Sequence, residues 1–375
     1  MAGLYVHIPF CASRCIYCGF YSTLLPQLQP KYVDALVEEM KLRKDYLLSD
    51  DETGNDVDTI YIGGGTPSQL KTELFRRLML HIYMMYGNKA KEVTIEVNPD
   101  DVTLDYARFL VDNGVNRVSM GVQTFNDEML KFLHRRHSSD QVKVAVRELR
   151  KAGINNISID LMYGLPNETL MDWKKDLIQA LSLGVEHISA YSLMYEKGTA
   201  LYILRENNKV FEDEELNVKM YEELVERLVK AGYEHYEISN FAHPGRKAIH
   251  NSSYWNDTPY IGLGAASHSY NGTSRQWNVA DIKKYIAAIS HGEVPAEIEK
   301  IDDATHYNDL ITTALRTSRG LELSMVQSEF KEYLYQNAQK YIDNGKLEIA
   351  DDCIRITKAG IFVSDMIMSD LVYVD

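Results

Sequence analysis

Three cysteines near the start of the chain have the residue type and spacing that most clearly point to chemistry. Cys11, Cys15 and Cys18 follow the pattern C-x3-C-x2-C. An apolar run at residues 4–8 precedes them, and Pro9 ends regular strand pairing because proline has no N–H for a sheet ladder. The cysteines are therefore expected on a loop just past a strand, where the three thiolates can turn toward one object.

This spacing favours either zinc or an iron–sulfur cluster. A structural zinc site needs four ligands, and the chain has neither a second C-x2-C-like pair nor an H-x3-H pattern. A cubane cluster takes one thiolate per iron, so three cysteines would leave one iron open to another ligand. The remaining alternative is three buried cysteines without a metal, which such tight spacing in a reduced protein disfavours.

The residues around the cysteines resemble a known family. C-x3-C-x2-C with an aromatic residue, Tyr17, before the last cysteine is the radical S-adenosylmethionine (SAM) motif. The wider string from Tyr5 to Cys11 resembles the oxygen-independent coproporphyrinogen III oxidase group. The resemblance implies a 4Fe–4S cluster whose open iron is chelated by SAM. It also implies that an electron from the cluster cleaves SAM to a 5′-deoxyadenosyl radical.

Composition and charge exclude several function classes. The chain has 375 residues, 45% of them hydrophobic and 25% charged, which is ordinary for a globular protein with a sizeable core. Its net charge of −14 argues against a nucleic-acid groove, which needs a basic stripe. The N-terminus lacks a signal segment, and no apolar run approaches the roughly 20 residues of a membrane span. We expect no nucleic-acid partner, no membrane span and a reducing, cytoplasmic location.

Strand-like and helix-like segments alternate up to about residue 193. The expected strands are residues 4–8, 59–62, 93–97, 117–120, 156–162 and 187–193. The expected helices are residues 31–47, 70–86, 104–113, 139–152 and 170–183, and residues 51–58 form a polar loop. Repeated βα units build parallel sheets or barrels with sites at the C-terminal strand ends. The expected fold class is therefore α/β, with a partial (β/α)6-type barrel.

Glycines and polar side chains follow these strands. The turn at residues 63–67, Gly-Gly-Gly-Thr-Pro, is neither a P-loop nor a dinucleotide fingerprint, but its glycines allow close backbone approach to a ligand. By the resemblance, this turn holds the methionyl part of SAM and Glu96 meets the ribose hydroxyls. The residues that match SAM-contacting positions of the family are Tyr5, Tyr17, Gly64, Gly65, Thr66, Glu96, Gln123, Arg135 and Asp160. Several of them resemble residues that line a second SAM region in the decarboxylase.

The stretch His-Asn-Ser-Ser-Tyr-Trp at residues 250–255 is the second informative one. It resembles the signature of the heme-chaperone branch of the same group. Histidine is a common ligand of heme iron, and tyrosine and tryptophan can pack against a macrocycle. The residues alone also fit a hydrogen-bonded histidine and two core aromatics. The heme-motif residues are His250, the candidate iron ligand, Asn251, Tyr254 and Trp255, with His243 and His268 as alternative ligands.

Two domains are expected, residues 1–278 as the barrel with a heme-motif extension and residues 279–375 as a C-terminal α+β domain. Before the boundary we expect a helix at 213–231 and a strand at 233–238. After it we expect helices at 281–291, 303–314 and 328–344, strands at 347–350 and 353–356, and a closing helix. This order resembles a winged helix. Its lack of a basic face favours packing against the barrel over DNA binding.

Two departures from the decarboxylase set the expected function. Gly19-Phe20 stands where that enzyme has Gly-Cys, and the first strand begins by about residue 4 without a long leading segment. With the heme motif, these features favour a chaperone that binds a 4Fe–4S cluster, SAM and heme and transfers heme to an acceptor protein. The alternative is a radical SAM enzyme acting on a tetrapyrrole, such as a coproporphyrinogen III decarboxylase. A flavodoxin- or ferredoxin-type electron donor is the other expected partner.

Overall fold

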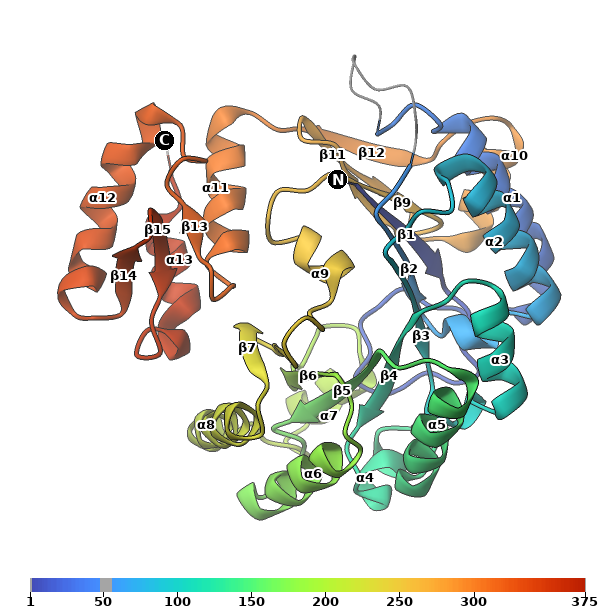
Figure 1. The fold of residues 1–375 in the computed structure, drawn as a ribbon, viewed down its shortest axis with the longest axis horizontal. Coiled ribbons are helices and arrows are strands. Elements are labelled where there is room, and N and C mark those ends of the chain that lie inside the picture. The colour runs from blue at the N-terminus through green and yellow to red at the C-terminus, as the bar shows by residue number, and fades with distance from the viewer. Residues whose placement is uncertain (1, 48–55, 375) are drawn as a thin grey trace.

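A curved sheet organises the larger part of the molecule in the computed structural model, which describes residues 2–47 and 56–374 (Figure 1). Its strands follow the order β12-β11-β10-β9-β1-β2-β3-β4-β5-β6-β8-β7. The parallel strands are β1 (Gly3–Ile8), β2 (Thr59–Gly64), β3 (Glu92–Val97), β4 (Arg117–Gln123), β5 (Ile157–Tyr163), β6 (His187–Ser192) and β9 (Tyr260–Leu263). The antiparallel strands are β7 (Glu234–Glu237), β8 (Asn240–Ala242), β10 (His268–Tyr270), β11 (Ser274–Asn278) and β12 (Ala296–Lys300).

Helices line the convex side of this sheet (Figure 1). Those that follow the first strands are α1 (Gln29–Leu42), α2 (Thr72–Tyr86), α3 (Leu104–Asp112), α4 (Asp127–Phe132), α5 (Ser139–Ala152) and α6 (Leu170–Ser182). After β6 come α7 (Ala200–Glu206), α8 (Glu214–Lys230) and α10 (Ile282–Ser290), while α9 (Ile249–Ser253) lies on the concave side of the sheet (Figure 1). The expected partial (β/α)6-type barrel is confirmed. The expected loop at residues 51–58 lies mostly outside the described residues.

The strands alternate between an apolar outer face and a polar inner face. In β1, Leu4, Val6 and Ile8 are fully buried against the helices, whereas the rings of Tyr5 and His7 face the barrel interior. The same period of two places the side chains of the other barrel strands. The inner face is therefore a surface of hydroxyl, carboxylate, imidazole and guanidinium groups, while the hydrophobic core lies between the sheet and its helices.

The barrel remains open, and each of its edges is extended by antiparallel strands. On one side β9 pairs in parallel with β1, and β10, β11 and β12 continue from it. On the other side β8 pairs antiparallel with β6, and β7 follows. Strand β9 brings the chain back to the barrel sheet at residues 260–263. The sequence did not predict β8 or β10 to β12.

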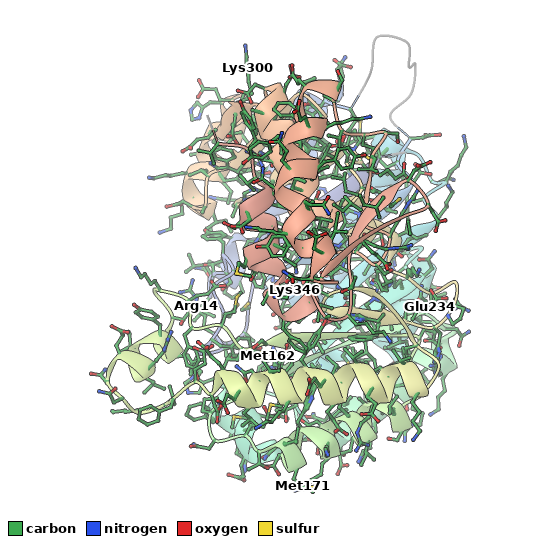
Figure 2. All side chains as sticks on the ribbon, turned by 90° about the vertical axis from the view of Figure 1, so that its left-hand side faces the viewer. Arg14, Met162, Met171, Glu234, Lys300 and Lys346 are labelled. Carbon is green, nitrogen blue, oxygen red and sulfur yellow. The ribbon has the colours of Figure 1, made fainter. Side chains whose placement is uncertain are left out.

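A second hydrophobic core forms the C-terminal unit. Its elements are α11 (Asp303–Ala314), β13 (Leu321–Glu322), α12 (Ser328–Asp343), β14 (Leu347–Ala350), β15 (Cys353–Ile356) and α13 (Ser364–Leu371). Helices surround a small sheet of order β13-β15-β14, which fits the expected α+β domain. Figure 2 faces this side of the molecule, with α8 running across below the C-terminal unit.

The division between the two cores lies later in the chain than residue 279. Helix α10 contributes Ile282, Tyr285 and Ile289 to the barrel core, and β12 pairs with β11 of the barrel sheet. The second core begins with Tyr307 on α11. The expected boundary at residue 279 therefore coincides with the end of β11 and precedes the C-terminal core.

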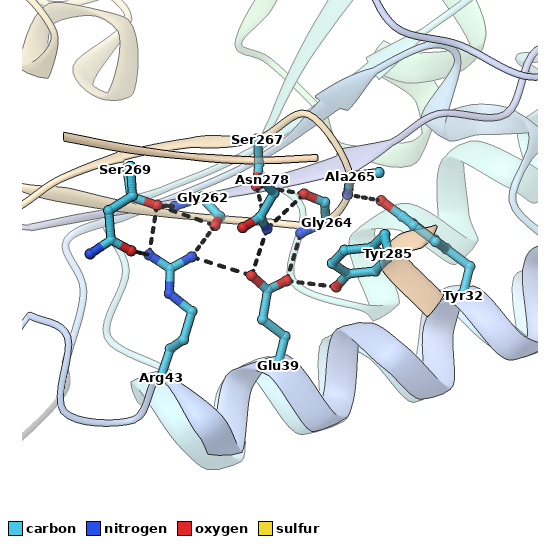
Figure 3. A network of polar contacts seen from close by, with 11 residues as sticks. Tyr32, Glu39, Arg43, Gly262, Gly264, Ala265, Ser267, Ser269, Asn278 and Tyr285 are labelled. Carbon is cyan, nitrogen blue, oxygen red and sulfur yellow. Dashed lines mark hydrogen bonds and ion pairs between the residues drawn. The ribbon is translucent and has the colours of Figure 1, made fainter. Parts of the chain in front are cut away.

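A buried ion pair fastens α1 to the extended edge of the sheet (Figure 3). Arg43 Nη1 lies 3.2 Å from Glu39 Oε1 and donates to the carbonyl oxygen of Gly262 in β9 at 2.8 Å. Glu39 also accepts hydrogen bonds from Tyr285 Oη at 2.6 Å and Asn278 Nδ2 at 2.7 Å. Four elements distant in sequence, α1, β9, β11 and α10, are thereby joined around one carboxylate.

Candidate functional site

The three clustered cysteines lie together on the loop that follows β1, as expected. Backbone hydrogen bonds hold this loop in place, from Cys11 N to Thr23 O at 3.0 Å and from Leu201 N to Ile16 O at 2.9 Å. Cys11, Cys15 and Cys18 are half-buried free thiols that line one cavity of about 60 Å³. Their sulfur atoms therefore share one enclosed space at the C-terminal mouth of the barrel.

The groups around the three cysteines suit thiolates that each bind a separate metal atom. Burial raises the pKa of Cys11 and Cys18, so thiolates here need a compensating positive charge. Arg135 Nη1 lies 3.7 Å from Cys15 Sγ, and Thr66 Oγ1 donates to Cys11 Sγ at 3.4 Å. Among the described residues, no group of three histidine, cysteine or carboxylate side chains is placed to hold a single metal ion. Three thiols around one cavity, beside the Arg135 guanidinium, suit a cluster that takes one thiolate per iron.

The glycine turn after β2 packs directly on the cysteine loop. A Cβ added to Gly65 would lie 2.8 Å from the Pro9 carbonyl oxygen and 2.9 Å from Cys11 Sγ, which a side chain at this position cannot avoid. Gly64 has φ +120°, a left-handed conformation that favours glycine, and its N–H donates to Glu96 Oε2 at 3.0 Å. The turn therefore joins the thiols to the carboxylate at the end of β3.

Glu96 and Asp160 project from β3 and β5 toward the barrel interior. Tyr61 Oη donates to Glu96 Oε1 at 2.8 Å, and Ser119 Oγ lies 3.3 Å from Asp160 Oδ2. Burial raises the pKa of Glu96 to about 7 and that of Asp160 to about 6. The negative charge of Asp160 is one of the causes that raise the pKa of Glu96, so the two carboxylates lie within one electrostatic environment.

Gln123 and Arg135 complete the expected set around the same mouth. Arg135 Nη2 donates to the Gly121 carbonyl oxygen at 2.6 Å and to Asn98 Oδ1 at 2.7 Å. Gln123 has φ +68° at a bulge in β4, and its amide nitrogen lies close beside Gly121. The bulge turns this side chain toward the arginine instead of the outer core.

The two tyrosines of the expected set occupy different depths. Tyr17 lines the small cavity with the cysteines. Tyr5 lies in the barrel interior, where its hydroxyl is 3.0 Å from His7 Nδ1, and His7 Nε2 is 3.0 Å from the Tyr21 carbonyl oxygen just beyond the cysteines. The structure thus brings the nine expected SAM-contacting residues to the C-terminal half of the barrel, beside the thiols.

The heme motif lies at the opposite, N-terminal end of the strands. His250, on α9, is 1% exposed, and its Nδ1 lies 2.8 Å from Thr59 Oγ1 at the start of β2. Its Nε2 lies 2.8 Å from Tyr254 Oη, and burial lowers its pKa to about 3. Both ring nitrogens are therefore engaged. A metal at His250 would have to replace the contact with Thr59 or with Tyr254, and the assignment of His250 as the heme ligand stays a prediction.

The other motif residues continue outward from His250. The Tyr254 ring packs edge-on against Tyr260, with ring centroids 4.8 Å apart. Asn251 is half-buried and accepts the backbone N–H of Tyr254 at 3.2 Å through its carbonyl oxygen. The Trp255 ring lies under the Arg316 guanidinium of the C-terminal unit at 5.2 Å. The motif thus connects the barrel floor with the C-terminal unit and makes no direct contact with the cysteines.

Sequence reasoning missed the residues that support this site from the inner face. Tyr61 stacks on His250, with ring centroids 5.1 Å apart, and donates to Glu96. Glu92 accepts the N–H groups of Ile249 and His250 at 2.8 and 3.0 Å and so holds the first turn of α9. The sequence does carry a signal for a polar inner face. Strands of a sheet that helices cover on both faces are continuously apolar, whereas polar residues alternate with apolar ones in these strands.

The curved parallel sheet, with three cysteines on the loop after its first strand and a glycine turn packed on that loop, defines a radical SAM protein. Residues 5–179 match the Radical SAM superfamily, and residues 301–363 match the HemN C-terminal domain. The protein described as heme chaperone HemW of Bacillus subtilis is 38% identical over 301 residues, covering 79% of this chain and 78% of that protein. That of Lactococcus lactis is 35% identical over 350 residues, covering 92% and 89%. The chain belongs to the HemW family.

A solved structure shows the same fold. Coproporphyrinogen III oxidase (HemN) from Escherichia coli, a radical SAM enzyme, superposes with a TM-score of 0.84 over 99% of this chain and 90% of that chain. At 24% identity this likeness describes the fold alone. Among the described residues, no helix is both long and apolar enough to cross a membrane.

The raised pKa of Glu96 predicts a pH-dependent stability. Folding moves this pKa from 4.5 to about 7, so the folded protein keeps a proton that the unfolded chain releases. The free energy of unfolding should therefore fall as pH rises from about 4.5 to about 7, by about 3 kcal/mol from this group. Urea denaturation at a series of pH values measures the slope. Glu96→Gln should flatten it, and an unchanged slope would assign the proton to another group.

Proposed function

We propose that this protein is a heme chaperone, which binds heme and transfers it to an acceptor protein. The observation that carries the proposal is identity of 35–38% to proteins described as heme chaperone HemW, over most of the chain in each case. The motif at residues 250–255 supports the same assignment. The acceptor is a protein of unidentified sequence that receives heme by direct contact.

The cofactors of the proposal are a 4Fe–4S cluster and SAM, which membership of the radical SAM superfamily implies. Cys11, Cys15 and Cys18 would hold the cluster at their shared cavity. The residues gathered at the barrel mouth would hold SAM, with Glu96 for its ribose hydroxyls and the glycine turn for its methionyl group. The chemistry that the cluster supplies is one-electron transfer to SAM, so a flavodoxin- or ferredoxin-type donor and a reducing compartment such as the cytoplasm belong to the proposal.

The second candidate is a radical SAM enzyme that decarboxylates coproporphyrinogen III, as the fold of HemN allows. One anaerobic experiment separates the two functions. Reconstituted protein is titrated with hemin while the Soret band is followed, and a parallel sample with SAM and reductant is assayed for protoporphyrinogen IX. Near-stoichiometric heme binding without decarboxylation supports the chaperone. SAM-dependent decarboxylation without a stable heme complex would establish the enzyme instead.

We expect His250→Ala to bind hemin with the stoichiometry and Soret maximum of the wild type. The substitution leaves the hydroxyls of Thr59 and Tyr254 unpaired in a buried place, so it should lower the free energy of unfolding by about 1–3 kcal/mol. Soret titration and urea denaturation measure the two effects separately. A lost Soret band at unchanged stability would support His250 as the iron ligand.

A further inference from the structure

We propose that heme occupies the groove between α8 and β7 of the barrel and the C-terminal unit. This inference rests on the proposed heme-binding function and names the site that serves it. The groove has a volume of about 970 Å³, near the upper end of the range of about 300–1,000 Å³ for small-molecule and cofactor sites. It lies at the junction of the two cores, on the side that faces the viewer in Figure 2.

Two apolar walls face each other across this groove. One wall is a single face of α8, where Tyr221, Val225 and Val229 recur at intervals of four residues. The opposite wall carries Ile361 and Phe362 of the C-terminal unit, and the Phe362 ring closes one end of the groove by packing edge-on against the Tyr221 ring, with centroids 5.5 Å apart. Two apolar walls from different elements suit a flat, apolar macrocycle, which needs cover on both faces.

Two cations in the groove match the two propionate groups of heme. Lys230, at the end of α8, and Lys358, after β15, both line it, and neither makes an ion pair among the described residues. The two arginines of the groove already hold carboxylates, with Arg316 3.2 Å from Glu237 and Arg355 2.8 Å from Glu348. Two acidic residues, Glu222 and Glu226, lie earlier on α8. We therefore assign the two propionates to Lys230 and Lys358.

The heme motif touches this groove through its last residue. Trp255 lies under Arg316, which lines the groove, and the Arg316 carbonyl oxygen accepts the N–H of Ile238 at 3.1 Å. The motif therefore contacts the junction of the two cores through Trp255, although His250 is buried at the N-terminal end of the barrel strands. His235 is the one histidine among the described residues of the groove, and its Nε2 already lies 3.2 Å from the Ile238 carbonyl oxygen. The proposal consequently rests on the walls and the lysines, without an axial ligand.

Other cavities suit heme less well. The cavity among the cysteines, at about 60 Å³, is far too small for a tetrapyrrole. A cavity of about 550 Å³ beyond β4 and β5 is lined by four carboxylates and two lysines. These residues are Glu128, Glu168, Asp172, Asp176, Lys175 and Lys209. Excess negative charge there would repel the propionates.

The test places a charge on the apolar wall of the groove in the full-length protein. Val229→Glu puts a carboxylate among apolar side chains at a position that is 47% exposed, so the fold should tolerate it. We expect the Kd for hemin, measured by Soret titration, to rise at least tenfold with unchanged cluster content. Val144→Glu on α5, at a position 40% exposed and remote from the groove, should leave the Kd unchanged.

A second measurement reports on the lysines. Wild type should bind hemin more tightly than hemin dimethyl ester, whose propionates are uncharged, and the Lys230→Gln/Lys358→Gln double variant should lose this preference. Hemin binding by Val229→Glu at wild-type affinity would overturn the groove while the chaperone function stands. A preference for hemin that persists in the double variant would overturn the propionate contacts. Absence of any hemin binding by the wild type would instead refute the proposed function itself.

Discussion

The Cys15→Ala protein is expected to contain no iron–sulfur cluster after anaerobic reconstitution. A cubane held by three protein thiolates has one ligand for each of three irons, so removing one leaves an iron without a protein ligand. Cys15 Sγ lies 3.7 Å from Arg135 Nη1 at the cavity that the three thiols share. Iron and sulfide analysis, together with the visible absorption of the cluster, should show background levels in this variant.

The matched control is the same substitution at the fourth cysteine. Cys353 lies buried in β15 of the C-terminal unit, in a different hydrophobic core from the three clustered thiols. Cys353→Ala should keep the full iron and sulfide content and lose only a small amount of stability. Wild-type cluster content in Cys15→Ala would remove the assignment of the three cysteines as ligands.

The sequence was sufficient to place the candidate cofactor residues because they follow consecutive strands. Parallel strands put their C-terminal ends at one edge, so a glycine turn after β2 and a carboxylate at the end of β3 had to meet. The contact of Gly65 with Cys11 and the hydrogen bond from Gly64 to Glu96 are consequences of that rule. The apolar outer face fixes the register of these strands, because a shift of one residue would turn the apolar side chains toward the barrel interior.

The position of the heme motif could not be predicted in this way. Helix α9 spans only Ile249–Ser253, and no periodic apolar face fixes its place. Its position depends on Glu92, which accepts two of its N–H groups, and on Thr59, almost two hundred residues away in sequence. Such contacts form only when segments distant in sequence come together at the N-terminal end of the barrel strands. The sequence could therefore show that the motif exists, but not that its histidine is enclosed.

The extended edge of the sheet was missed for a related reason. Strand β12, Ala-Glu-Ile-Glu-Lys, is mostly exposed, and its alternation is too short and too weakly apolar to mark a half-buried strand. Strand β9 has four residues and pairs with β1 from the other end of the barrel sequence. What holds this edge is the carboxylate of Glu39, whose partners lie on α1, β9, β11 and α10 (Figure 3).

Glu39→Ala should therefore be the most destabilising single substitution in this part of the molecule. Glu39 is 0% exposed and accepts from Asn278 Nδ2 at 2.7 Å, from the Gly264 N–H at 2.8 Å and from Tyr285 Oη at 2.6 Å, beside its ion pair with Arg43. Its removal leaves the buried Arg43 guanidinium without a counter-charge, and leaves the Gly264 N–H and the Tyr285 hydroxyl without their acceptor. Breaking one partner of a buried pair costs about 3–5 kcal/mol, so we expect a loss of that size in the free energy of unfolding.

The neighbouring residue provides the control, because Glu38 differs from Glu39 in environment and not in chemistry. Its side chain is 45% exposed and pairs with Lys41 at 2.8 Å on the surface of α1. Pairs of this kind contribute about 0–1 kcal/mol, so Glu38→Ala should unfold at nearly the urea concentration of the wild type. Both variants also gain the same helix propensity from alanine. Equal stability of the two variants would mean that the carboxylate of Glu39 does not hold β9 and α10 against α1.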